Sequence, residues 1–423
     1  MGHHIDTECI HAGYEPKNGE PRVLPIVQST TFKYDSAETL GAIFDLKSDG
    51  FFYTRISNPT IDAVEKKIAV LEGGVGALMT SAGQAASLIS VLNICHSGDH
   101  FIACSAIYGG TFNLFNKTIR EMGIECTFVS ADCSTEELNA AFRENTRCVF
   151  AETLSNPSLV VTDLESFAKV SHAHGVPLIV DNTFPTPVNC RPFEFGADIV
   201  VHSTTKYMDG HALQIGGVIV DSGKFNWDNG KFPMLTEPDE SYHGTVYTRD
   251  FGKSAYIVKA RVHLMRDLGA QASPMNAFFV NLGLETLALR MERHCSNAMA
   301  VAKFLESSDK IEWVNYPGLE SSSYHRLAMK YMPNGTCGVI SFGVKGGREA
   351  AAKFMENLKL ASIVIHVADL RTCVLHPAST THRQLNDEQL KAAGISPNMI
   401  RMSVGIENIE DILDDIRGSL KKL

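Results

Sequence analysis

Short apolar runs alternate with amphipathic stretches between about Val75 and Asp221. Each run is brief and almost free of charge, which is typical of strands that are buried on both faces. The predicted strands are Ala77–Thr80, Phe101–Cys104, Glu125–Val129, Cys148–Glu152, Pro177–Asp181, Asp198–His202 and Val218–Val220. Strand–helix alternation of this kind predicts an α/β fold with a mainly parallel sheet covered by helices on both faces.

Polar residues mark the ends of some of the intervening helices. Ser134 with Glu137, and Thr162 with Glu165, match the pattern in which a hydroxyl and a carboxylate together cap the first turn of a helix. Gly175 stands where the second of these helices would end, since glycine adopts the left-handed conformation that closes many helices. We therefore expect helices to begin at these two capping boxes and one helix to end at the glycine.

The pattern changes after the polar stretch Asn226–Tyr242. A long helix is predicted over Leu284–Leu305, with an apolar stripe formed by Leu284, Leu287, Leu289, Met291, Ala298, Val301, Ala302 and Leu305. The segments that follow are Gly338–Val344, Arg348–Leu358, Ser362–Val367, Met399–Val404 and a final helix opened by Asn408. This mixture of strands and helices predicts a smaller C-terminal α/β domain.

The first 60 or so residues lack such periodicity. Pro16, Pro21, Pro25 and Pro59 interrupt any long element, so we expect an irregular arm that packs on the chain's own body or on a neighbouring subunit. The predicted organisation is an N-terminal arm over 1–60, a large domain over 61–265 and a C-terminal domain over 266–423.

Composition and charge narrow the range of functions. The 423 residues include 38 Lys and Arg against 48 Asp and Glu, which gives a net charge of −10. This acidity argues against non-specific binding to nucleic acid or to an anionic membrane, because both need a basic face.

The ten cysteines are scattered without a C-x-x-C pair, as in reduced cytoplasmic proteins. The uncharged run Gly73–Cys95 is long enough to span a bilayer, but its polar residues and glycines predict a strand, a turn and a buried helix.

Three predicted strands are followed by residues suited to chemistry. In parallel sheets, ligands bind beyond the carboxyl ends of the strands, so these positions are expected to meet at one edge. The helix-opening segment Ser81-Ala82-Gly83-Gln84 can offer backbone N–H groups to a phosphate, Asp181-Asn182-Thr183 ends a buried strand, and Ser203-Thr204-Thr205-Lys206 joins hydroxyls to a lysine. Together these features predict a pyridoxal-phosphate site, which needs a lysine, an acid at the ring nitrogen and a phosphate cup.

Five longer segments resemble the Cys/Met-metabolism (trans-sulfuration) pyridoxal-phosphate enzymes: Val201–His211, Asp181–Thr183, Tyr53–Pro59, Glu152–Pro157 and His376–His382. The resemblance extends from about Ile10 to Ile416 and implies fold type I, as in aspartate aminotransferase. Within the family, the character of the O-acetylhomoserine sulfhydrylases is carried by the insertion Lys224–Asp250 and by Met265–Ala270 and Leu289–His294.

The resemblance implies roles at the cofactor. Lys206 would hold the cofactor covalently and move protons on the substrate, Asp181 would keep the pyridine nitrogen protonated, and Thr183 would support Asp181. A neighbouring cationic group and exclusion of water would keep this lysine partly neutral. The phosphate would be held by the backbone of Gly83 and Gln84 and by the hydroxyls of Ser203 and Thr205.

Other matches concern the substrate and the assembly. Tyr108 would stack on the cofactor ring and assist the leaving group, Asn156 would lie near the cofactor oxygen, and Arg401 would grip the substrate carboxylate. Tyr53 and Arg55 match residues that cross to the phosphate of the neighbouring subunit, and Tyr53 and Asn156 also match substrate contacts. The resemblance thus implies a homo-oligomer, either a dimer or a dimer of dimers.

The chain departs from the family in two places. Ahead of the His376 motif the family often has a Ser- or Asn-Leu-Gly-Asp run, whereas this chain has His366-Val367-Ala368-Asp369-Leu370, which leaves side-chain specificity open. Methionine γ-lyases typically carry a cysteine after the Tyr-Gly pair, and here the residue is Gly110. The second departure disfavours the lyase interpretation.

The reaction expected from the resemblance is γ-replacement on O-acetylhomoserine by sulfide or methanethiol, giving homocysteine or methionine plus acetate. A methionine γ-lyase or related γ-elimination remains an alternative, as does a sulfhydrylase or cystathionine γ-synthase that uses O-succinylhomoserine; phospho esters of homoserine are not distinguished either. A non-catalytic scaffold is disfavoured by the presence of Lys206, Asp181 and Arg401. No metal site is expected, because the histidines lack companions at metal-site spacing, and no GxGxxG loop follows the first strand.

Overall fold

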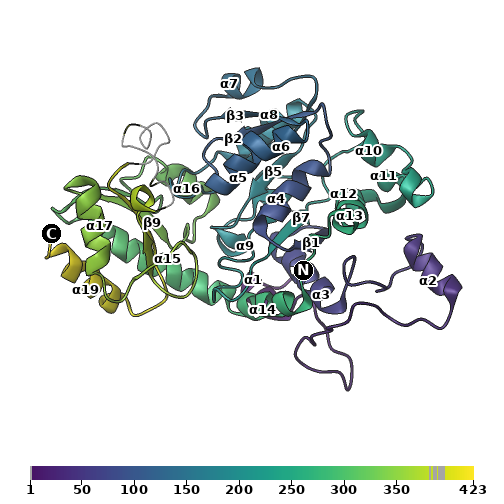
Figure 1. The fold of residues 1–423 in the computed structure, drawn as a ribbon, viewed down its shortest axis with the longest axis horizontal. Helices are drawn as coiled ribbons and strands as arrows, with labels where there is room; N and C mark the ends of the chain where they lie inside the picture. The colour runs from purple at the N-terminus through teal and green to yellow at the C-terminus, as the bar shows by residue number, and fades with distance from the viewer. Residues whose placement is uncertain (1, 381–382, 384–387, 389–395) are drawn as a thin grey trace.

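A seven-stranded sheet forms the first half of the molecule (Figure 1). The computed structural model describes residues 2–380, 383, 388 and 396–423. The strands are β1 (Gly76–Thr80), β2 (His100–Cys104), β3 (Glu125–Val129), β4 (Thr146–Glu152), β5 (Leu178–Asp181), β6 (Ile199–His202) and β7 (Gly217–Asp221). They confirm the seven predicted strands, with bounds that differ by no more than two residues.

The strand order across this sheet is β1-β7-β6-β5-β4-β2-β3. All pairs between β6 and β3 are parallel, whereas β7 runs antiparallel to both β6 and β1. Most strand residues are buried, which explains their continuous apolar character. The α/β class and the mainly parallel sheet are therefore confirmed.

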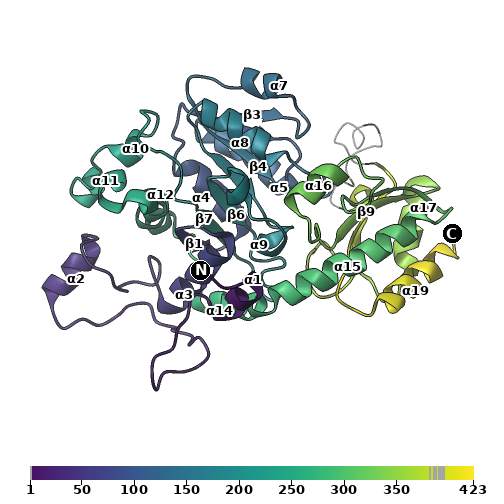
Figure 2. The same ribbon diagram turned by 180° about the vertical axis from the view of Figure 1, so that it is seen from behind.

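Helices cover both faces of this sheet. The two views place α4 (Gly83–Leu92) and α6 (Ile119–Glu121) on one face and α8 (Leu164–Ala173) on the other (Figures 1 and 2). The remaining helices of this half are α3 (Pro59–Glu72), α5 (Gly109–Asn113), α7 (Thr135–Ala140), α9 (Thr186–Asn189), α10 (Pro233–Thr236), α11 (Tyr247–Phe251), α12 (Ala255–Lys259) and α13 (Arg266–Leu268). The run over 73–95 forms β1, a turn and α4, as predicted, and none of the helices in the described part is long and apolar enough to cross a membrane.

Two of the three predicted helix-end signals are found in the structure. Ser134 and Glu137 form the expected capping box, and Gly175 follows the end of α8 with a φ of 65°. The predicted Thr162–Glu165 box is wrong, because Asp163 caps α8 through the Ser166 N–H. The Thr162 hydroxyl instead donates to the carbonyl of Glu152, the last residue of β4, at 2.7 Å.

A second, five-stranded sheet occupies the C-terminal part of the chain, in the order β10-β11-β12-β9-β8. Its strands are β8 (Ile311–Asn315), β9 (Val339–Val344), β10 (Ser362–Ile363), β11 (Cys373–Leu375) and β12 (Met399–Ser403). It packs with α15 (Leu287–Glu306), α17 (Gly347–Asn357) and α19 (Ile409–Leu420), and Asn408 caps α19 as expected; α16 (His325–Tyr331) lies nearby. The segment predicted over 362–367 is a strand only at its first two residues.

The long predicted helix corresponds to α15 but begins later than expected. Thr286 separates α14 (Pro274–Glu285) from α15 and has a φ of −114°, outside the helical range. Most of the predicted apolar stripe is fully buried on α15, but Leu289 is 72% exposed. The prediction that Leu289 is buried is wrong, because the next two side chains, Arg290 and Met291, face inward instead.

The N-terminal arm includes short helices. It contains α1 (Ile5–His11), which packs on α3, and α2 (Ala37–Phe44); they are seven and eight residues long, in keeping with the interruption of long elements that the prolines predict. Between them the chain loops away from the first sheet, and α2 lies apart from it (Figure 1). The division at residues 60 and 265 remains a prediction, although two separate hydrophobic clusters surround the two sheets.

Candidate active site

A cavity of about 190 Å³ lies at the carboxyl ends of β4, β5 and β6, beside the first turn of α4. Nine of the twelve site residues expected from the sequence line it: Gly83, Gln84, Tyr108, Asn156, Asp181, Thr183, Ser203, Thr205 and Lys206. Strands of one parallel sheet end at one edge, which is why segments distant in the chain meet here. Arg401 lies just outside this lining set, and Tyr53 and Arg55 line a different cavity.

Lys206 follows β6 by four residues and projects into the cavity. Burial, aided by the positive charge of Arg401, lowers the pKa of its amine to about 8. No hydrogen-bond partner holds the Nζ atom within the described part of the chain. With a pKa of about 8, roughly a tenth of this amine is neutral at pH 7, and that fraction can act as a nucleophile and a base.

Asp181 is the last residue of β5 and is partly buried. Its Oδ1 atom accepts hydrogen bonds from the Thr183 N–H at 2.9 Å and from the Thr183 hydroxyl at 2.5 Å. The Thr183 Oγ1 atom in turn accepts from the Ser203 N–H at 2.9 Å, so this threonine ties β5 to the loop that carries Lys206. Burial raises the pKa of the Asp181 carboxyl, and the hydrogen bonds from Thr183 oppose that rise.

The opposite end of the cavity is built from the N-terminus of α4. Gly83 is the first residue of this helix, so its N–H group and that of Gln84 precede the first intrahelical hydrogen bond. A side chain at Gly83 would bring a Cβ atom within 2.8 Å of the Ser203 Cβ atom, so glycine is required for this close approach. The Thr205 hydroxyl already bonds to Gly216, donating to its carbonyl at 3.2 Å and accepting from its N–H at 3.0 Å.

Glu152 is a buried acid in the cavity to which the sequence analysis assigned no role. It ends β4 and lies opposite Asp181 of β5, and its Oε1 atom accepts a hydrogen bond from the Tyr108 N–H at 2.6 Å. Burial and the neighbouring Asp181 carboxylate raise the pKa of Glu152 well above the usual value. Its position at a predicted strand end was the available signal, but only the adjacency of β4 and β5 shows that two carboxyls meet.

Arg401 comes from β12 of the second sheet and is buried. Its Nη1 atom donates to the Asn156 side-chain oxygen at 3.2 Å, and its Nη2 atom donates to the carbonyls of Ile365 at 2.9 Å and His366 at 3.4 Å. The backbone at Ile365 and at His366, where the segment that departs from the family begins, therefore positions the guanidinium. Ala368 in this segment has a φ of 67°, a conformation that favours the glycine found there in the family.

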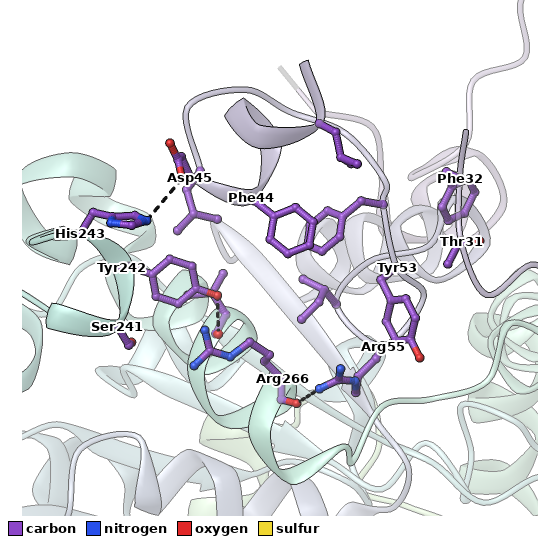
Figure 3. Close-up of a pocket in the computed structure, with 15 residues that line it drawn as sticks. Thr31, Phe32, Phe44, Asp45, Tyr53, Arg55, Ser241, Tyr242, His243 and Arg266 are labelled. Carbon is purple, nitrogen blue, oxygen red and sulfur yellow. Dashed lines mark hydrogen bonds and ion pairs between the residues drawn. The ribbon is translucent and has the colours of Figure 1, made fainter. Parts of the chain in front are cut away.

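Tyr53 and Arg55 do not meet Lys206 within one chain. They line a second cavity, of about 500 Å³, between the arm and the insertion over 224–250 (Figure 3). Arg55 donates a hydrogen bond to the Arg266 carbonyl, and the Phe44 and Phe52 rings pack at 4.3 Å between centroids. The expected crossing of these two residues to a neighbouring subunit remains a prediction.

No cluster of three potential metal ligands occurs among the described histidines, cysteines and carboxylates. The His376 motif begins after β11, where the His376 Nδ1 atom and the Ser379 hydroxyl are 2.7 Å apart. Thr381 and His382 of that motif lie outside the described residues.

A family model described as Cys/Met metabolism PLP-dependent enzyme matches residues 6–421. The chain belongs to this family. It is 45% identical to the O-acetyl-L-homoserine sulfhydrylase of Leptospira meyeri, over 99% of this chain and 97% of the relative. It is 46% identical to the homocysteine synthase of Schizosaccharomyces pombe, over 99% and 98% of the two chains.

The fold of the Cys/Met-metabolism family is also seen in a solved structure from Campylobacter jejuni, a candidate O-acetylhomoserine (thiol)-lyase. It superposes with a TM-score of 0.94 at 34% identity, covers 99% of both chains, and contains N'-pyridoxyl-lysine-5'-monophosphate at position 205 of that protein. Fold type I is therefore confirmed for this chain.

The cavity fits the cofactor of the Cys/Met-metabolism family, pyridoxal 5'-phosphate. The Asp181 carboxyl lines it, as does the first turn of α4, whose N–H groups have no partner within the helix. Lys206 lines the same cavity and has a lowered amine pKa. The donor set thus matches the pyridine nitrogen, the phosphate and the aldehyde carbon of the cofactor.

Proposed function

We propose that this enzyme replaces the acetyl ester of O-acetylhomoserine with sulfide or methanethiol, forming homocysteine or methionine and releasing acetate. The observation that carries the proposal is the cavity that gathers Lys206 and Asp181 beside the Asn156–Arg401 pair. The names of the full-length relatives from Leptospira and Schizosaccharomyces supply the substrate and the product.

In this proposal Lys206 is the group that moves protons. When bound, pyridoxal phosphate supplies an electron sink for the charge left at the substrate α-carbon. The Lys206 amine, neutral in part because its pKa is lowered to about 8, takes the α-proton and delivers it within the cavity. The nearby charge of Arg401 keeps that fraction high.

The other proposed roles divide the cavity between cofactor and substrate. Asp181, oriented by Thr183, pairs with the ring nitrogen. The proposed phosphate contacts are the N–H groups of Gly83 and Gln84 and the hydroxyls of Ser203 and Thr205. The Thr205 contact requires its hydroxyl to exchange its bond to Gly216 for one to the phosphate, which a rotation about one side-chain torsion achieves.

Arg401 and Tyr108 are proposed to act on the substrate. A bidentate pair between the Arg401 guanidinium and the α-carboxylate would fix the amino acid with its Cα–H bond perpendicular to the cofactor ring. Asn156, bonded to the same guanidinium, would hold its plane. Tyr108 is half exposed at the cavity mouth, where its hydroxyl can assist the departure of acetate.

We further propose that the enzyme is a cytoplasmic homo-oligomer in which Tyr53 and Arg55 complete the phosphate site of the neighbouring subunit. Tyr53 and Arg55 border a large cavity of their own chain and stand apart from the nine residues around Lys206. A symmetric dimer, or a dimer of dimers, would place one arm against each partner's site.

Product analysis with O-acetylhomoserine and sulfide together tests the reaction. Homocysteine and acetate should dominate, with 2-oxobutyrate minor, and Lys206→Ala should abolish both. A tenfold preference between replacement and elimination requires only about 1.4 kcal/mol between two barriers. Dominant 2-oxobutyrate at saturating sulfide would make this a γ-lyase, and faster turnover of O-succinylhomoserine in a parallel assay would overturn the choice of ester.

A further inference from the structure

Beneath the cavity lies a buried acid–imidazole pair that the proposed reaction does not use. The His202 Nε2 atom and the Glu72 Oε1 atom are 2.6 Å apart, and the two side chains are 1% and 0% exposed. His202 is the last residue of β6, four positions before Lys206, and Glu72 is the last residue of α3. Burial of such a pair costs desolvation energy that two apolar side chains would avoid.

Hydrogen bonds connect this pair to the strand ends that form the cavity. The Asn182 amide donates to Glu72 Oε1 at 3.1 Å and to the Cys190 carbonyl at 2.8 Å, and its oxygen accepts from the Thr153 hydroxyl at 2.9 Å. Asn182 directly follows Asp181. The pair is therefore linked to the backbone on which the acid of the cavity is carried.

The register of the strands places His202 on the other face of the sheet from Asp181. Asp181 pairs with Val201 of β6, and successive side chains along a strand point to opposite faces. Asp181 faces the cavity, and its chain neighbour Asn182 bonds to Glu72, the acid that also contacts His202. A single sheet thickness thus separates the imidazole from the carboxylate.

The surroundings of Asp181 act on its pKa in opposite directions. Burial disfavours its carboxylate, whereas the two hydrogen bonds from Thr183 favour it. The imidazole of His202 also lowers the pKa of Asp181. The 2.6 Å contact between Glu72 and that imidazole is an ion pair whenever His202 is protonated.

We propose that Glu72 and His202 are positioning residues that keep the Asp181 carboxylate ionised toward the ring nitrogen of the cofactor. The inference rests on the proposed role of Asp181. It assigns a reason to the buried pair, since an acid that lost its proton only with difficulty could not hold the ring nitrogen in its protonated form. The two residues touch neither cofactor nor substrate.

His202→Gln is the deciding variant, because the glutamine amide can still donate to Glu72 but carries no charge. The matched control is Asp198→Asn, which breaks the His172–Asp198 pair, 2.7 Å long, at the other end of the same strand. For each variant, the apoprotein is titrated with pyridoxal phosphate between pH 5 and 9, and binding is followed by the visible absorption band. Folding is checked by circular dichroism.

We expect the pH below which cofactor binding weakens, the acid limb of the profile, to rise by about one unit in His202→Gln. The same pH should be unchanged in Asp198→Asn. Glu72→Gln should shift it in the same direction by less, because His202 would keep its ring but lose its anionic partner. An unchanged acid limb in a folded His202→Gln protein would overturn the proposal. So would failure of both His202→Gln and Glu72→Gln to fold, since the pair would then serve stability alone.

Asp181→Asn separates this proposal from the one on which it rests. If Asp181→Asn leaves the pH profile of cofactor binding unchanged, the assignment of Asp181 is wrong, whatever the His202 variants do. If Asp181→Asn alters the profile and His202→Gln does not, only the role of the pair is wrong.

Discussion

The carboxyl-terminal and the amino-terminal ends of the parallel strands form two opposite edges of the large sheet. Carboxyl groups lie at both edges, but their surroundings differ. At the carboxyl ends of the parallel strands, Glu152 and Asp181 face the cavity that contains Lys206. At the opposite edge, Asp198 precedes β6 and lies beside Asp221, the last residue of antiparallel β7. Burial raises the pKa values of all four carboxyls, and that of Asp221 rises to about 7.

The partners of these carboxyls are what distinguish the edges. Asp198 bonds to His172 at 2.7 Å and to the Leu178 N–H at 2.9 Å, and Asp221 accepts from the Gly223 N–H at 2.8 Å. These are contacts within one edge of the fold, and they tie loops to strands. At the carboxyl edge, by contrast, charged groups from both sheets surround an open cavity. A shifted pKa by itself therefore does not identify a catalytic site.

Two buried lysines illustrate the same difference. Burial lowers the pKa values of both Lys206 and Lys259 to about 8. Lys259 Nζ donates to the Asn93 carbonyl at 3.0 Å and to its side-chain oxygen at 3.3 Å, next to the C-terminal end of α4. Lys206 lines the cavity at the other end of α4, a helix of ten residues that is about 15 Å long.

Replacement of Lys206 should have the largest effect. Lys206→Ala should lower kcat by roughly 10²–10⁴-fold or more and abolish covalent labelling of the chain by borohydride in the presence of cofactor, because no other described amine faces the cavity. Peptide mapping after reduction measures the labelled position. Lys259→Met is the matched control and should retain labelling at Lys206. Labelling of Lys206→Ala at another lysine would contradict the assignment.

The second largest effect compares acids at the two edges. Asp181→Asn should lower kcat by about 10²–10³-fold, since a fixed charge at a reacting group is lost, while unfolding stability changes little. Asp198→Asn should leave kcat within a few-fold. It should lower the free energy of unfolding by about 1–3 kcal/mol, because His172 and the Leu178 N–H lose a charged hydrogen-bond acceptor. Steady-state kinetics and urea unfolding give both numbers. Reversal of the two patterns would show that the edges were assigned the wrong way round.

Asp221 should have a smaller effect that depends on pH. Its pKa is 3.8 in the unfolded chain and about 7 in the folded protein, so the folded state binds the extra proton between these values. The stability of the wild type should therefore fall as pH rises through this window. Asp221→Asn, which is neutral throughout, should match the wild type near pH 4 and exceed it by about 1–3 kcal/mol at pH 8, less than the full shift would give. Urea unfolding at both pH values provides the measurement; equal differences at the two would contradict it.

The smallest effect is expected at Glu152. Burial and Asp181 raise its pKa well above the usual value, which favours the neutral carboxyl, and glutamine is a close substitute for that form. Glu152→Gln should retain the hydrogen bond from the Tyr108 N–H and change kcat/KM by less than about threefold. Glu152→Ala, which loses the acceptor, should cost more. A tenfold loss in Glu152→Gln would indicate that an ionised Glu152 is needed.

Much of the fold was predictable because its strands are buried on both faces. The apolar runs over 101–104 and 178–181 do not fit the pattern of an amphipathic helix, and each is followed by polar residues. The position of the site followed as well, since Gly83, Asp181 and Lys206 each come soon after a strand end. Local signals were less reliable at Thr162, where a neighbouring aspartate proved the better cap, and at Leu289, where the helix began later than its periodicity implied.

The sequence by itself determined the α/β class, the seven strands and the chemistry available at their ends, because these depend on periodicity and on residues close in the chain. Only the tertiary structure decided which groups interact across it. The lateral order of β4, β5 and β6 brings Glu152 beside Asp181, the second sheet brings Arg401 to Asn156, and the packing of α3 brings Glu72 to His202. These contacts join residues separated by 29 to 245 positions along the chain, and their strength depends on burial, which no local pattern specifies.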